Sequence, residues 1–194
     1  MALVEDAPRP GRPRDPAVDK AILAATLEAF AEDGYAGVSI EGVAARAGVG
    51  KAAIYRRFPS KAELVVEAMR IGACINDELP DTGDLRADLV AMMRVMVERL
   101  RGPDGHVLLT FAAERVRNPE LGAEFQRSVI GAKRAHIRSL IAAAIERGEL
   151  PANTDVDITA EAGPALVWHH ALNNLPLDDD LPTRIVAMVL PPAA

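Results

Sequence analysis

Cysteine, aromatic rings and long apolar runs are all scarce in this 194-residue sequence. The single cysteine, Cys74, excludes an intrachain disulfide and a metal site built from clustered cysteines. Only 4% of the residues are aromatic, so alanine, leucine and valine supply most of the apolar surface, which favours closely packed helices. No apolar run is as long as a membrane span, and the first residues lack the pattern of a secretion signal. We therefore expect a helical protein of the reducing cytoplasm, with no membrane partner.

Basic charge is also in deficit, because the net charge is −6. The deficit is uneven: residues 1–70 hold 10 basic and 10 acidic residues, which leaves 12 basic and 18 acidic residues for the remainder. Between Gly42 and Ala62 there is no acidic residue, but there are five basic ones, namely Arg46, Lys51, Arg56, Arg57 and Lys61. This local excess is compatible with a DNA-contacting patch or with an ordinary solvated face, and charge alone leaves both open.

Apolar spacing and capping residues predict an all-α chain of about nine helices, with no strand-like alternation. The expected helices span about 16–34, 39–48, 50–57, 60–75, 85–100, 106–117, 119–147, 156–175 and 180–190. We expect Gly163-Pro164 to interrupt the eighth helix, because proline lacks the N–H that a helix interior needs. The organisation predicted is a flexible basic arm over 1–15, a DNA-binding unit over 16–62 and a larger helical region over 63–194.

The segment from Ser39 to Lys61 has the pattern of a helix-turn-helix. Two short helices meet at Gly48, where a tight turn favours a residue without a Cβ. Ile40, Val43 and Ile54 can hold the two helices together. The second helix then directs outward the residues Lys51, Ala52, Ala53, Tyr55 and Arg56, an arrangement suited to a DNA major groove.

The stretch from about Ile22 to Met69 resembles the DNA-binding domain of the TetR/AcrR family of repressors. The matching marks are Phe30-Ala-Glu-Asp-Gly-Tyr35, Ser39-Ile40, Val43-Ala44, Arg46-Ala-Gly-Val49, Lys51, Ile54-Tyr55 and Phe58-Pro-Ser-Lys61. This resemblance implies phosphate contacts from Ser39, Tyr55 and Lys61, and a basic residue at Lys51 that opens the recognition helix. The sequence departs from the family at Gly50, where Ser or Thr is common, and at Ala52-Ala53, which leaves few hydrogen-bonding groups for base edges.

The full predicted DNA-contact set is Arg12, Arg14, Ser39, Gly50, Lys51, Ala52, Ala53, Tyr55, Arg56 and Lys61. Two members have simpler alternatives. Tyr55 can instead pack in a small core, and the arm that carries Arg12 and Arg14 can be an idle tail rather than a minor-groove contact.

Five large apolar residues behind the DNA-binding unit are candidates for an effector pocket: Met92, Met96, Phe111, Phe125 and Trp168. Each can equally be plain core, but the resemblance implies an inducer pocket among these helices. Trp168 either forms a pocket wall or fills the seam of a dimer. The prediction is thus a ligand-responsive repressor that binds a palindromic double-stranded DNA operator as a homodimer, with no cofactor.

Other chemistry finds little support. Gly48-Val-Gly-Lys51 fails as a phosphate loop, because its first glycine would fall on Ala45 and no strand precedes it. His169 and His170 are helical neighbours that point about 100° apart, so they do not form a metal pair. No catalytic set stands at a meaningful spacing, and we expect no enzyme. The alternatives left open are a small-molecule-binding or catalytic helical protein that retains the motif, and a regulator without an effector.

Overall fold

The computed structural model describes residues 15–72 and 80–190. The predicted contacts Arg12 and Arg14, and Cys74, lie outside the described residues. Within the described ranges every regular element is helical, which confirms the all-α prediction. The elements are α1 (Pro16–Gly37), α2 (Ile40–Ala47), α3 (Lys51–Tyr55), α4 (Lys61–Gly72), α5 (Leu85–Arg101), α6 (Gly105–Arg117), α7 (Pro119–Phe125), the π-helical η1 (Gln126–Ile130), α8 (Gly131–Glu146), α9 (Val156–Leu172) and α10 (Leu181–Val189). They make nine helices, as predicted, when α7, η1 and α8 count as one rod.

Local signals explain where the first helices begin and end. Asp15 accepts a hydrogen bond from the Ala17 N–H at 3.0 Å and so caps α1, while Pro16 occupies the first helical position. Gly34 has φ +66°, as a helix-ending glycine can, but a further turn follows it as far as Gly37.

Two details of the predicted helices are wrong. The helix expected over 119–147 is not uniformly α-helical, because η1 inserts a π turn at Gln126–Ile130. The helix expected to break at Pro164 runs on to Leu172 without interruption. Close packing explains the second case: a Cβ added to Gly163 would lie 2.8 Å from Met93 Sδ, so α9 lies tightly against α5. Packing of α9 against α5 therefore holds the helix together, although proline inside a helix costs on the order of 3 kcal/mol.

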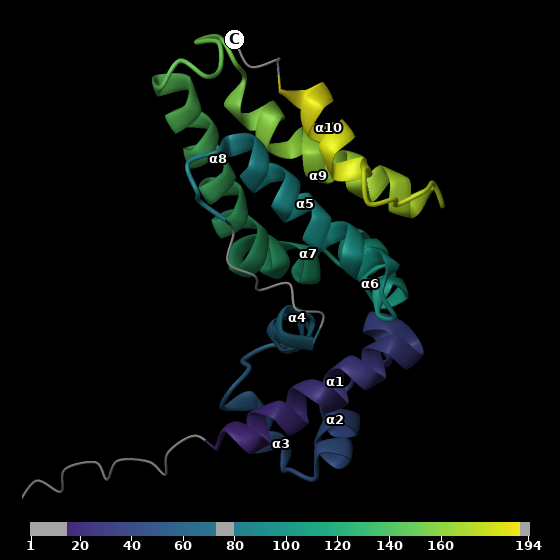
Figure 1. Cartoon of the computed structure of the whole chain (residues 1–194). Coiled ribbons are helices and arrows are strands. Elements are labelled where there is room, and N and C mark those ends of the chain that lie inside the picture. Colours follow the sequence, from purple (N-terminus) through teal and green to yellow (C-terminus); the bar gives the residue numbers. More distant parts are fainter. Residues whose placement is uncertain (1–14, 73–79, 191–194) are drawn as a thin grey trace, which may run out of the picture.

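The buried apolar residues of the described ranges form two cores, and Figure 1 shows the helices that contribute to them. The first joins α1 to α4 with α6 and α7, and includes Ile22, Ile54, Met69 and Leu121. The second joins α5, α8, α9 and α10 around Met93 and Ile141. The first core therefore extends past the boundary expected at residue 62, because α4 packs on α1 and α7 alike.

Candidate nucleic-acid interface and ligand cavity

The turn between α2 and α3 has the geometry that a helix-turn-helix requires. Gly48 ends α2 with φ +65°, in the left-handed region where a Cβ is strained. Ser39 begins α2, and its Oγ accepts a hydrogen bond from the Gly42 N–H at 3.1 Å. Val43 and Ile54 are fully buried between the helices and α1. The turn and its clamp therefore hold α3 in a fixed orientation.

The outer face of α3 carries the residues that the sequence analysis placed there. Lys51, Ala52, Tyr55 and Arg56 are exposed, and Ala53 is half-buried. Tyr55 is 53% exposed, which rules out the small-core alternative for its ring. Ser39 and Gly50 are exposed as well, so seven of the ten predicted contacts belong to the helix-turn-helix and none of the seven is buried.

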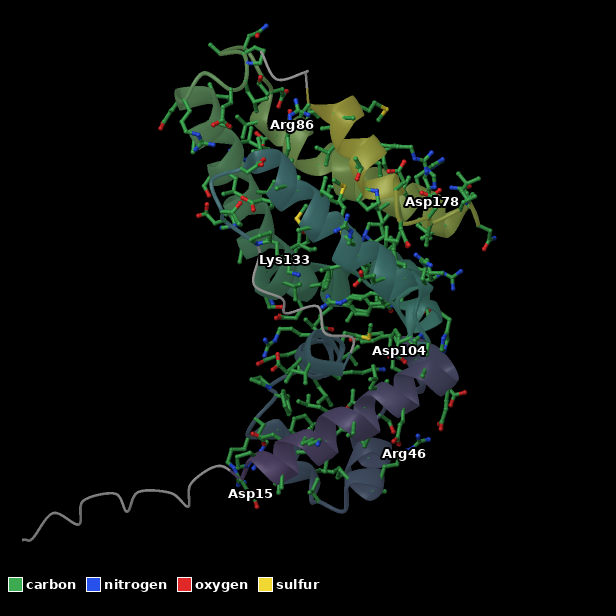
Figure 2. The ribbon with its side chains drawn as sticks, in the orientation of Figure 1. Asp15, Arg46, Arg86, Asp104, Lys133 and Asp178 are labelled. Atoms are coloured by element: carbon green, nitrogen blue, oxygen red, sulfur yellow. The ribbon has the colours of Figure 1, made fainter. Side chains whose placement is uncertain are left out.

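Acidic residues from α1 and α2 offset much of the basic charge counted in the sequence. Lys51 Nζ donates a 2.9 Å hydrogen bond to Glu41 Oε1, which raises the pKa of the Lys51 ammonium and lowers the pKa of Glu41. Arg46, labelled in Figure 2, pairs with Glu32 on α1. The acid-free stretch is thus not an unopposed basic patch, because its partners come from elsewhere in the chain.

Arg57 is a structural clamp rather than a solvated residue, the alternative that its place in the sequence left open. Its guanidinium pairs with Asp19 near the start of α1, and its Nη1 donates to the Ala53 carbonyl at 3.0 Å. Its side chain is only 8% exposed. Since Asp19 lies 38 residues away, sequence spacing gave no signal for this pair.

Lys61 lies apart from the α3 surface. Its ammonium sits 4.3 Å from the centre of the Tyr35 ring, where burial lowers the pKa of Lys61. Burial raises the pKa of Tyr35, and Glu120 adds to the effect. The charges that act on Lys61 belong to Glu114 in the last turn of α6 and Glu120 in the first turn of α7. Its phosphate contact stays a prediction.

A cavity of about 590 Å³ lies among α5, η1, α8 and α9. A second cavity of about 150 Å³ adjoins it toward α6 and α7 and shares several wall residues. The first is lined in part by Met92, Met96 and Trp168, and the second by Met96, Phe111, Phe125 and Trp168. All five predicted pocket residues therefore line one or both cavities, and Trp168 lines both.

The sequence analysis missed the charged residues of these walls: Arg99, Arg115, Lys133, Arg134 and Glu161. Arg134 pairs with Glu161 across α8 and α9. Lys133, labelled in Figure 2, belongs to the α8 side of the cavity. Arg115 stands over the Phe125 ring, with 5.6 Å from its guanidinium carbon to the ring centre. No local motif marks such residues, because only the fold brings α5, α6 and α8 around one space.

The outward faces of α9 and α10 expose large apolar side chains. Ile158 and Leu172 on α9, and Met188 on α10, are all more than half exposed. On α9 the exposed Ile158, Ala165 and Leu172 follow the helical repeat and share one face with His169 and with Glu161, which also lines the larger cavity. Apolar residues gathered on one face mark a candidate interface.

The described residues contain neither a membrane-spanning helix nor a cluster of metal-binding side chains. No described helix is both long and apolar enough to cross a membrane. Within 15–72 and 80–190, no three His, Cys, Asp or Glu residues come together as a metal site.

Two family models cover most of the chain. The one described as "Bacterial regulatory proteins, tetR family" matches residues 22–68, and "Tetracyclin repressor-like, C-terminal domain" matches residues 79–189. Together they span the helix-turn-helix and the helices that surround the cavities.

Individual relatives agree with the family models over nearly the whole chain. An uncharacterized HTH-type transcriptional regulator of Mycobacterium tuberculosis, Rv1556, is 31% identical over 187 residues, covering 94% of this chain and 92% of that protein. A DNA-binding transcriptional repressor, TetR, of Mycobacteroides abscessus is 30% identical over 171 residues, covering 88% and 90%. The crystal structure of the TetR family transcription regulator SCO0332 superposes with a TM-score of 0.68 at 27% identity, covering 89% and 96%. All three are transcriptional regulators by description, and the chain itself belongs to the TetR family of DNA-binding transcriptional regulators.

Proposed function

We propose that this regulator is a ligand-responsive repressor that binds a palindromic operator as a homodimer. The observation that carries the proposal is the pairing, in one chain, of an exposed α3 face with a cavity of about 590 Å³ in the C-terminal helices. A volume of that size suits a small organic molecule. The related repressor of Mycobacteroides abscessus supports repression over activation.

At the DNA, α3 enters the major groove and flanking groups hold the phosphates. The hydroxyls of Ser39 and Tyr55 donate to phosphate oxygens, and Arg56 supplies a positive charge. Lys51 reaches phosphate by leaving Glu41. Base contacts are sparse, because Ala52 and Ala53 offer only methyl groups, which suit thymine methyls.

Two chains pair through the exposed faces of α9 and α10. Ile158, Leu172 and Met188 would then be buried against the second copy, as a two-fold interface requires. Trp168 is half-buried against the first core and lines both cavities, so it serves as pocket wall rather than dimer seam.

Ligand binding lowers DNA affinity only if the ligand favours the state that does not bind DNA. The path proposed runs from the cavity walls to α4, which packs on both α1 and α7. A tilt of α4 would change the spacing of the two α3 helices in the dimer.

The test is selection of genomic fragments by the purified protein, followed by titration of one retained fragment at several salt concentrations. We expect retention of a site with two-fold symmetry and an affinity that falls steeply with salt. Small molecules are then screened for DNA release together with a change in the emission of Trp168, the single tryptophan. A protein that retains no fragment, or whose retained DNA no small molecule releases, would contradict the proposal.

A further inference from the structure

We infer that the effector is an apolar molecule bearing a single carboxylate, held by Arg115. This inference rests on the ligand response proposed above and names the chemical class of the ligand. It follows from the position of the Arg115 guanidinium, which lines both cavities and has aromatic rings beside it.

Arg115 on α6 is half-buried and lines both cavities. Its guanidinium carbon lies 5.6 Å from the Phe125 ring centre, and Phe125 meets Phe111 edge to face with ring centres 5.0 Å apart. Among the described residues, no carboxylate oxygen lies within ion-pairing distance of Arg115. Its charge therefore faces ring carbons and solvent in the cavity.

The other charged residues of the cavity walls already have partners, so they are weaker candidates for binding a ligand's charge. Arg134 and Glu161 neutralise one another, and Glu161 is the one acidic residue among the described wall residues. Arg99 and Lys133 have interactions of their own, and the proposal assigns the ligand's charge to Arg115. A cationic ligand would find its acid already occupied and would meet the repulsion of Arg115.

Filling the cavity removes water from Arg115. A neutral apolar ligand would leave a guanidinium desolvated without a partner, which is unfavourable. A carboxylate removes that penalty, because its two oxygens match the planar fork of arginine. One such arginine fits one negative charge, while Met92, Met96 and Trp168 receive the apolar body.

The experiment compares carboxylic acids with their primary amides, which have nearly the same shape but no charge. Calorimetric titrations of the full chain use decanoate against decanamide, and 2-naphthoate against 2-naphthamide. We expect at least one acid to bind about tenfold or more tightly than its amide, as a charge-assisted hydrogen bond allows. Arg115→Gln should bring acid and amide to within about threefold of each other.

Two further variants make the result decisive. Arg115→Lys keeps the charge but loses the fork, so an intermediate preference is expected, even if Arg115→Gln folds poorly. Arg94→Gln removes an exposed arginine of α5 that lines neither cavity, and should keep the full preference. Acids that bind no better than their amides, no binding of either acid, or a preference that survives in both Arg115 variants would overturn the inference. DNA retention without ligand is measured separately, so loss of the proposed function is distinguishable from loss of acid preference.

Discussion

Glu114 and Arg115 are neighbours on α6, yet they face different parts of the molecule. Arg115 lines the two cavities, whereas a Cβ placed on Gly34 of α1 would lie 3.7 Å from Glu114 Oε1. Glu114 also accepts a 2.9 Å hydrogen bond from Asn118 Nδ2, which fixes its carboxylate. A displacement of α6 around a ligand at Arg115 would therefore move Glu114 against Gly34, near the end of α1. The helix-turn-helix begins directly after α1.

The ion pair between Lys51 and Glu41 should restrain DNA binding. Glu41→Gln would release Lys51 for phosphate and remove a negative charge that faces the DNA. We expect tighter binding to operator and random DNA alike, with a salt slope steeper by up to about 0.9 log units for one added phosphate contact. Fluorescence anisotropy across a salt series measures this slope.

Two substitutions on α3 test its place at the DNA. Lys51→Ala and Tyr55→Phe should each weaken binding, the latter by about 1 kcal/mol. Unchanged affinity in both variants would remove α3 from the interface.

Substitution of the neighbouring Arg56 and Arg57 should affect different properties, DNA binding for Arg56 and folding stability for Arg57. Arg57→Met removes a buried guanidinium and leaves the half-buried carboxylate of Asp19 and the Ala53 carbonyl without their donor, so we expect a loss of about 1–3 kcal/mol in the free energy of unfolding. Arg56→Met should change stability by less than about 0.5 kcal/mol, since its side chain is exposed, but should weaken DNA binding. Urea denaturation and anisotropy separate the two effects, and equal stability of both variants would refute the clamp.

Gly48 and Gly50 offer a matched pair for the turn. Neither has a neighbouring atom within 4 Å of an added Cβ, but Gly48 has φ +65° and Gly50 has φ −80°. Gly50→Ser should cap α3, which has no side-chain cap, and raise the free energy of unfolding by about 0.5 kcal/mol. Gly48→Ser should lower it by about 1 kcal/mol because of its left-handed backbone. Chemical denaturation distinguishes these signs, and a destabilised Gly50→Ser would show that the cap geometry is not as described.

A carboxylate introduced into the proposed α9–α10 interface should dissociate the dimer. Leu172→Glu on α9 should give monomers in sedimentation experiments, because burying an unpaired carboxylate at an interface is strongly unfavourable. Val116→Glu is the control, since Val116 is 78% exposed on α6 and lies outside the α9–α10 face. Trp168→Phe should leave the dimer intact if the indole is a cavity wall. A dimeric Leu172→Glu protein would place the interface elsewhere.

Local chemistry decided which features could be predicted from the sequence. The turn at Gly48 and the burial of Ile54 depend on residues within one short segment, so pattern and turn preference were sufficient. The contact of Arg57 with Asp19 and the gathering of Arg115 and Arg134 around one cavity depend on packing between distant helices. The π turn at Gln126–Ile130 and the unbroken passage through Pro164 are likewise set by neighbouring helices that no local signal describes.

The brevity of α3 has a consequence for redesign. With five residues, α3 is far too short to persist alone, and its orientation comes from Ile54 inside and the Arg57 anchor on α1. A graft of this helix into another protein would lose its shape unless Asp19 and its helix moved with it. Within its own scaffold, however, positions 51, 52, 55 and 56 can be exchanged without disturbing that anchorage. Because Lys51, Tyr55 and Arg56 are proposed to meet phosphate, a new operator preference would be sought first at Ala52, while the other three positions would tune overall affinity.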